Sequence, residues 1–193
     1  MSQQVLEKLF DSPAKLRLLK LFLRNPEDKF ALKDLRKRTL LQTKSVNKQL
    51  KKLLDIKFVK RSKRKGSYYY YLNQDFAFLE ELQNLILKSS PADQKKMLKN
   101  LKGVGRIKLA VLSGVFIKTD REDLKTDLLI VGSGINNKKL ESFIKNLEAE
   151  AGTELYYTVL TNDEFQYRHK MFDRFILDIL EKPHKKLINK LIR

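Results

Sequence analysis

The chain has 193 residues, a formal net charge of +18 and no cysteine. These values exclude a disulfide scaffold and a cysteine-based zinc site, while 42% hydrophobic residues are enough for one or two small folded domains. No apolar run approaches the roughly 20 residues that span a bilayer, and the N-terminus does not have the pattern of a signal peptide. We therefore expect a cytoplasmic protein with a polyanionic partner, either nucleic acid or an anionic membrane surface.

The positive charge is concentrated in one segment. Between Lys29 and Lys65 there are 15 basic and 2 acidic residues, so this segment carries +13 of the +18. A solvated surface is the simplest interpretation of such a run, and the rest of the chain has an ordinary mixed surface. A functional interpretation is favoured here because the cations coincide with a regular pattern of helices and strands.

The first half of this pattern predicts three helices. Ser12 and Pro13 have the residue types of a helix start, and the apolar spacing that follows predicts a helix over 13–24. A short second helix is expected around Leu35. Thr43 is expected to cap a third helix, with apolar residues on one face and basic or polar residues on the other.

A basic β-hairpin is expected to follow the third helix. Residues 58–61 and 68–72 favour strands, and the polar segment between them contains Gly66. Because neighbouring side chains of a strand point to opposite faces, the four consecutive tyrosines of the second strand should divide into a core-facing pair and an exposed pair.

These residues carry a resemblance to a known family. The segments SPAKLRLLKLF, LKDL, TKSVNKQLKKLLDIKFVKR and KRKGSYYYYL resemble winged helix-turn-helix transcription regulators over about residues 10–75. The resemblance implies that the helix 44–54 enters the DNA major groove and that the wing 58–72 lies on the DNA backbone. The turn 39–42 departs from the family pattern because it has no glycine.

The expected DNA contacts follow from side-chain chemistry. Long cations neutralise phosphates, whereas amides and hydroxyls also read base edges. Asn47 is the main candidate for a base contact because its amide pairs with adenine, and Ser45 is a second candidate. The alternative for Asn47 is a solvated polar position, and the alternative for Ser45 is a role at the helix start. The expected DNA-binding residues are Thr43, Lys44, Ser45, Asn47, Lys48, Lys51, Lys52, Arg61, Lys63, Arg64 and Lys65.

The remainder of the chain predicts a helical connector and a second domain. Strands and helices alternate after Gly103, which indicates an α+β protein. The expected domains are 1–75 and 104–193, joined by a connector over 76–103 whose second helix opens after Ser90-Pro91. The expected elements of the second domain are strands at 107–112, 127–131 and 155–160 and helices at 137–150 and 162–180.

The segment LAVLSGVFIKTDREDLKTDLLIVG resembles the start of the nucleotidyltransferase fold. The resemblance implies a Gly-Ser pair for a triphosphate and an Asp-x-Asp pair for magnesium. Asp127 matches the second aspartate, but Lys125 stands at the first, where its charge would repel Mg²⁺. We therefore expect a degenerate, non-catalytic relative that needs no metal or cofactor, with Ser113 and Asp127 as candidate ligand-binding residues; for Asp127 the alternative is a polar residue at a strand start.

The interpretation that the sequence favours is a DNA-binding transcription regulator that acts as a homodimer. Its second domain would serve for dimerisation or for sensing a small-molecule effector, and no membrane contact is expected. Two alternatives stay open: an RNA-binding regulator, and a magnesium-dependent nucleotidyltransferase that uses Asp120, Asp123 and Asp127. The loop Gly132–Gly134 between a strand and a helix has backbone N–H groups suited to an anion, although such a loop is more often only a turn.

Overall fold

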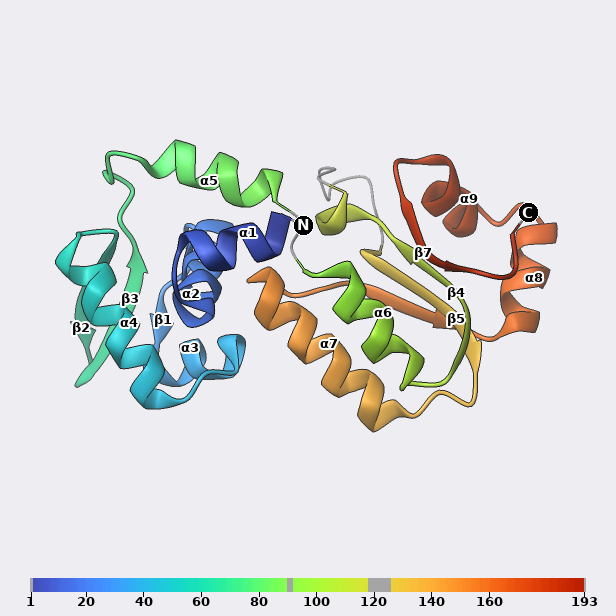
Figure 1. The fold of residues 1–193 in the computed structure, drawn as a ribbon, viewed down its shortest axis with the longest axis horizontal. Coiled ribbons are helices and arrows are strands. Elements are labelled where there is room, and N and C mark those ends of the chain that lie inside the picture. The colour runs from blue at the N-terminus through green and yellow to red at the C-terminus, as the bar shows by residue number, and fades with distance from the viewer. Residues whose placement is uncertain (1, 90–91, 118–125, 193) are drawn as a thin grey trace. The chain divides into compact units, whose positions relative to one another are not determined.

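The computed structural model describes residues 2–89, 92–117 and 126–192. It is a mixed α+β structure with two sheets, so the predicted α+β class is confirmed. The chain divides into two compact units (Figure 1). Unit 1 comprises Met1–Pro91 and Glu148–Glu154, and unit 2 comprises Ala92–Leu147 and Leu155–Arg193.

Unit 1 is mainly helical, with one small antiparallel sheet of order β1-β3-β2. The helix α1, which the sequence analysis did not predict, precedes the expected elements. The elements of unit 1 are α1 (Ser2–Leu9), α2 (Pro13–Arg24), β1 (Phe30–Ala31), α3 (Leu32–Thr39), α4 (Thr43–Asp55), β2 (Val59–Arg64), β3 (Ser67–Leu72) and α5 (Leu79–Lys88).

Helix α2 is the centre of the core of unit 1. The Ser12 hydroxyl accepts a hydrogen bond from the Lys15 backbone N–H at 3.1 Å, and Pro13 occupies the first turn, as expected for a helix start. Leu18 and Phe22 are completely buried. Side chains of α4, β3 and α5 share this core, so α2 fixes the positions of the helix and the hairpin that carry most of the basic residues.

The turn between α3 and α4 differs from expectation in one respect. The N-cap of α4 is Gln42, so the prediction that Thr43 caps the helix is wrong; Thr43 is already its first helical residue. Leu40, at the end of α3, adopts a left-handed conformation with φ of 55°. This is the conformation that a glycine usually provides, so the turn is made here without one.

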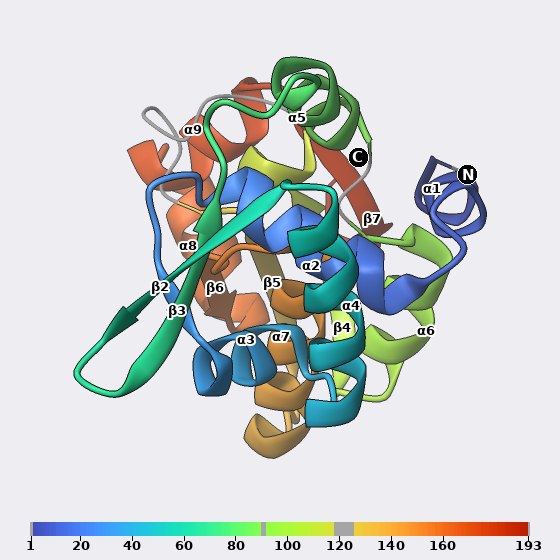
Figure 2. The ribbon, with the colours of Figure 1, turned by 90° about the vertical axis from the view of Figure 1, so that its left-hand side faces the viewer.

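Strands β2 and β3 form a hairpin that extends beyond the helices of the unit (Figure 2). Arg61 lies opposite Tyr70 and Lys63 opposite Tyr68, so these four side chains share one face of the hairpin. Of the four tyrosines only Tyr70 packs against the core cluster. The expected core-facing pair is therefore wrong, because the hairpin leaves the core after the buried pair of Val59 and Leu72.

Unit 2 is built on a four-stranded sheet of order β6-β5-β4-β7. Strands β5 and β6 are parallel, and β4 pairs antiparallel with β5 and β7. The elements of unit 2 are α6 (Gln94–Lys102), β4 (Arg106–Leu112), the short 3₁₀ turn η1 (Gly114–Phe116), β5 (Leu128–Ser133), α7 (Asn137–Ala151, whose last turn belongs to unit 1), β6 (Tyr157–Leu160), α8 (Asn162–Lys170), α9 (Arg174–Glu181) and β7 (Lys185–Asn189).

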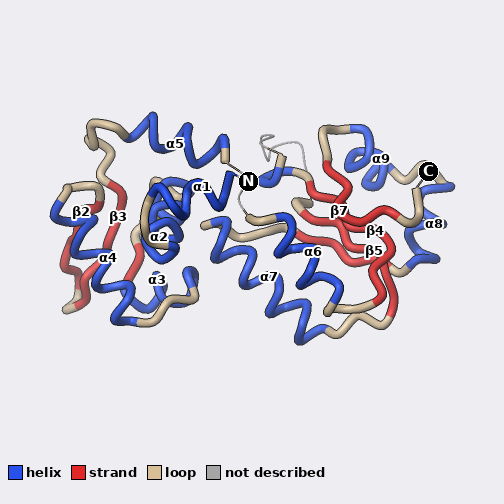
Figure 3. Tube along the Cα trace, in the orientation of Figure 1, coloured by secondary structure: helices blue, strands red, loops and turns tan. Residues whose placement is uncertain are grey.

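Helices cover both faces of this sheet (Figure 3). Leu128 and Ile130 of β5 pack with side chains of α6 and α7, whereas Leu129 and Val131 pack with side chains of α8 and α9. Both faces of β5 are thus buried, which explains its continuous apolar sequence. The result is a layer of helices, a sheet and a second layer of helices.

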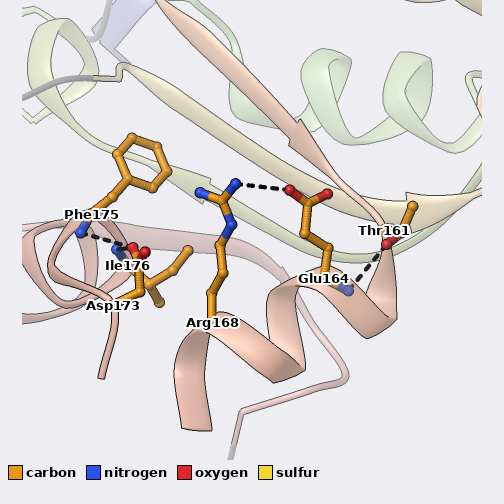
Figure 4. A network of polar contacts seen from close by, with 6 residues as sticks. All are labelled: Thr161, Glu164, Arg168, Asp173, Phe175 and Ile176. Carbon is orange, nitrogen blue, oxygen red and sulfur yellow. Dashed lines mark hydrogen bonds and ion pairs between the residues drawn. The ribbon is translucent and has the colours of Figure 1, made fainter. Parts of the chain in front are cut away.

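The expected single helix over 162–180 is instead two helices. Thr161 caps α8 by accepting a hydrogen bond from the Glu164 backbone N–H, and Arg168 pairs with the Glu164 carboxylate (Figure 4). Asp173 caps α9 and accepts hydrogen bonds from two backbone N–H groups. Phe172 is 77% exposed because it lies in the turn between them. Strand β7 was not predicted from the sequence either.

Candidate nucleic-acid interface

Helix α4 and the hairpin line one groove of about 470 Å³ in unit 1. Asn47 and Lys51 come from α4, and Arg61 and Tyr70 come from one face of the hairpin. This placement follows from the sequence because Val46 and Leu53 hold another side of α4 in the core. The candidate base-reading residue Asn47 thus shares a groove with cations from two elements.

The cations expected to contact DNA are exposed, and none of them forms an ion pair with a described carboxylate. Their charge is therefore available to an outside partner. Thr43 and Ser45 are half-buried, and of the expected set the groove is lined by Asn47, Lys51 and Arg61 alone. The exposed residues of the expected set are Lys44, Asn47, Lys48, Lys51, Lys52, Arg61, Lys63, Arg64 and Lys65.

The Tyr68 ring contacts two of these cations. The Arg61 guanidinium lies 4.9 Å from the centre of the Tyr68 ring, and the Lys63 Nζ lies 6.0 Å from the same ring. Such contacts between a cation and an aromatic face restrict a long side chain without neutralising it. Tyr68 therefore belongs to the candidate interface, although it was not predicted from the sequence; the alternation of cations and tyrosines across the hairpin is the signal that points to it.

A second basic hollow of about 350 Å³ lies on the other face of the hairpin. Arg64 and Lys65 line it together with Lys29 and Tyr69. Lys29 was not predicted to belong to the interface, because it lies between the first and second predicted helices. Its Nζ lies 5.1 Å from the centre of the Tyr71 ring, which brings it to the hairpin. Both faces of the hairpin are therefore cationic.

One cation of the hairpin is already paired. Lys60 Nζ lies 2.7 Å from a carboxylate oxygen of Asp75, and this hydrogen bond lowers the pKa of Asp75 below its usual value. Lys60 is therefore not a free cation of the hairpin.

In unit 2, Ser113 and Asp127 lie side by side but are buried, with Asp127 2% exposed. The Ser113 hydroxyl donates to the Thr126 carbonyl. The two carboxylate oxygens of Asp127 accept hydrogen bonds from the backbone N–H groups of Val115 and Tyr156, each at 2.9 Å. Ser113 thus joins the end of β4 to the segment before β5, and Asp127 joins η1 to the segment before β6, so both side chains are engaged within the protein.

The structure does not describe the other residues on which the resemblance to the nucleotidyltransferase fold depends. Asp120, Asp123 and Lys125 lie outside the described residues, as does Ser90-Pro91. Within the described residues no group of His, Asp and Glu is arranged to hold a metal ion.

Within the same residues, no helix has the length and apolar character needed to cross a membrane. Comparison of the chain with known protein families, with curated proteins and with solved structures finds no match.

Proposed function

We propose that the protein is a sequence-specific DNA-binding transcription regulator that acts in the cytoplasm. In this proposal unit 1 is a winged helix domain, α4 is its recognition helix and the β2–β3 hairpin is its wing. The observation that carries the proposal is the common groove in which Asn47 and Lys51 of α4 face Arg61 of the hairpin. A single duplex lying along α4 then meets a base-reading amide flanked by phosphate-binding cations.

The order of elements supports this proposal. Helices α2, α3 and α4, with the short strand β1 before α3, precede the hairpin that completes the three-stranded sheet. The apolar side of α4 is buried and its opposite side is basic and exposed. An exposed basic helix of 13 residues on a rigid core fits the width of the DNA major groove.

We further propose that unit 2 is a degenerate nucleotidyltransferase-like domain without catalytic activity, and that it serves for dimerisation or ligand sensing. Lys125 in place of the first metal-binding aspartate and the internal use of the Asp127 carboxylate support the loss of catalysis. Dimerisation is expected because one winged helix reads few base pairs, and two linked half-sites raise affinity and selectivity.

Asn47→Ala should relax the choice of DNA sequence, whereas Lys48→Ala combined with Lys51→Ala should weaken binding to every duplex. A good bidentate amide contact discriminates against the wrong base by about 1–3 kcal/mol, whereas phosphate contacts carry no direct sequence information. Selection of bound sequences from a random duplex library, followed by affinity measurements on the selected and scrambled sites, separates the two effects. Equal discrimination by Asn47→Ala and the unchanged protein would remove Asn47 from base recognition.

The kind of nucleic acid is tested by competition. Duplex DNA and a structured RNA of equal charge compete for the unchanged protein at the same ionic strength. Preferential binding to DNA supports a regulator that reads the major groove, and preferential binding to RNA would overturn the DNA assignment.

A further inference from the structure

A second basic surface of the molecule lies in unit 2, at the end of the β4–β5 pair opposite to Ser113 and Asp127. Strand β4 begins there with Arg106, which pairs with Ser133 at the end of β5. A hollow of about 710 Å³ opens at this place between the loop before β4 and the loop before α7. It contains the Ser133-Gly134 turn, which the proposed DNA binding by unit 1 does not use.

The hollow is lined by cations and has no carboxylate. Lys102, Arg106 and Lys139 line it, and all three are exposed and make no ion pair within the described residues. The first-turn N–H of Lys139 is already bonded to the Asn136 side chain, so the attraction for an anion rests on the side-chain cations. Three converging unpaired cations favour a ligand with more than one negative charge.

A second hollow of about 740 Å³ continues from the first, because Lys102 and Arg106 line both. Half-buried Leu98, Leu187 and Ile188 form its apolar surface, and the exposed Lys108 and Lys190 line it as well. The two hollows together offer five cations, which are Lys102, Arg106, Lys108, Lys139 and Lys190, around one apolar surface. A DNA backbone would use only the cations, whereas a compact ligand with a charged end and a flat apolar end would use both.

The backbone of the first hollow depends on the absence of a side chain at Gly132. A Cβ atom added there would lie 2.6 Å from the Arg106 carbonyl oxygen. Gly132 therefore allows β5 to end close against the start of β4, which brings Arg106 beside the Ser133-Gly134 turn. Gly132 is therefore needed for the close packing of β4 and β5, and this packing also shapes the hollow.

We propose that these joined hollows bind a nucleoside triphosphate or diphosphate. The phosphates lie on Lys102, Arg106 and Lys139, and the base lies on the aliphatic side formed by Leu98, Leu187 and Ile188. This is binding without a chemical step. It is independent of the proposed DNA contact because all the residues involved belong to unit 2.

The test is titration of the full chain with ATP in the absence of divalent cations, followed by isothermal titration calorimetry. Arg106→Ala combined with Lys139→Ala should lower the affinity for ATP by at least about tenfold, since each removes a charge-assisted contact. The matched control is Lys145→Ala combined with Lys185→Ala, which removes two exposed cations outside the hollows. An equal loss in both variants would overturn the site.

Two further arms locate the ligand. The variant Lys48→Ala, Lys51→Ala, Lys63→Ala, Arg64→Ala should keep its affinity for ATP, and loss of binding in it would place ATP on unit 1 instead. ATP should bind about tenfold more tightly than tripolyphosphate at the same ionic strength, because only ATP has a base to cover the aliphatic surface. Equal affinities would contradict the nucleotide assignment. Neither arm depends on whether the protein binds DNA.

Discussion

The stability of unit 1 should rise by about 2–3 kcal/mol between pH 7.5 and pH 9.5, and Lys20→Met should abolish this rise. Lys20 lies on α2 and is completely buried in unit 1. Its Nζ donates a hydrogen bond to the Glu150 carbonyl oxygen at 3.1 Å. Burial, with a smaller repulsion from Arg24, lowers the pKa of Lys20 to about 7.

The sign of the effect follows from the two protonation states. In the unfolded chain the amine has its ordinary pKa of about 10.5. Between pH 7 and that value the unfolded chain therefore holds a proton that the folded chain has released. Because the unfolded state binds more protons, the free energy of unfolding rises with pH across this window and is constant with respect to Lys20 below it.

Urea unfolding followed by circular dichroism at several pH values between 6 and 9.5 measures this slope. Lys15→Met is the matched control because it removes an amine from the same helix at a position that is only half-buried. We expect the free energy of unfolding of Lys15→Met to rise with pH as it does in the unchanged protein. The same pH dependence in Lys20→Met as in the unchanged protein would show that Lys20 is not the titrating group.

Asp127→Ala should destabilise unit 2 by about 3–5 kcal/mol, because it leaves two partly buried backbone N–H groups without their charged acceptor. Gly114→Ala should act on the same contact, since a Cβ atom there would approach the Asp127 carboxylate closely and the residue has a positive φ of 48°. Both variants therefore test the contact between the Asp127 carboxylate and the backbone around Gly114.

Hydrogen exchange of the β5 amides reports the local stability of unit 2 in these variants. Asp163→Ala is the control, because Asp163 is an exposed carboxylate at the start of α8 and its loss should cost less than about 1 kcal/mol. A small effect of Asp127→Ala, comparable to that of the control, would mean that the carboxylate is not needed for folding and is free for another role.

Much of unit 1 was predictable because its signals are local. Ser12-Pro13 marks the start of α2, the apolar spacing of Val46 and Leu50 marks the buried side of α4, and the segment around Gly66 marks the hairpin turn. The exposed cations of α4 follow from the same helical period. The turn at Leu40 was predictable in position, but its left-handed conformation was not, since leucine rarely adopts it.

Other features depend on contacts between distant residues. Lys20 has no sequence signal of burial, because its carbonyl partner Glu150 is 130 residues away. From the sequence alone Asp127 resembles a metal ligand. Only the fold shows that its carboxylate accepts hydrogen bonds from the backbone N–H groups of Val115 and Tyr156. Strand β7 was missed because only its pairing with β4 makes a short segment with two lysines a strand.

The most direct test of the proposed DNA contact is the salt dependence of binding to random duplex DNA. The variant with Lys48, Lys51, Lys63 and Arg64 changed to Ala is compared with the unchanged protein and with a control in which Lys95, Lys145, Lys170 and Lys185 are changed to Ala. These control lysines are exposed in unit 2 and line neither the groove nor the hollows of the described structure.

Each phosphate contact contributes about 0.9 to the slope of log affinity against log salt concentration. If α4 and the hairpin lie on the DNA backbone, the first variant should lose about 3.6 from the slope, and the control should lose little. An unchanged slope in the first variant, or an equal fall in the control, would contradict the assignment of α4 and the hairpin as the DNA-binding surface.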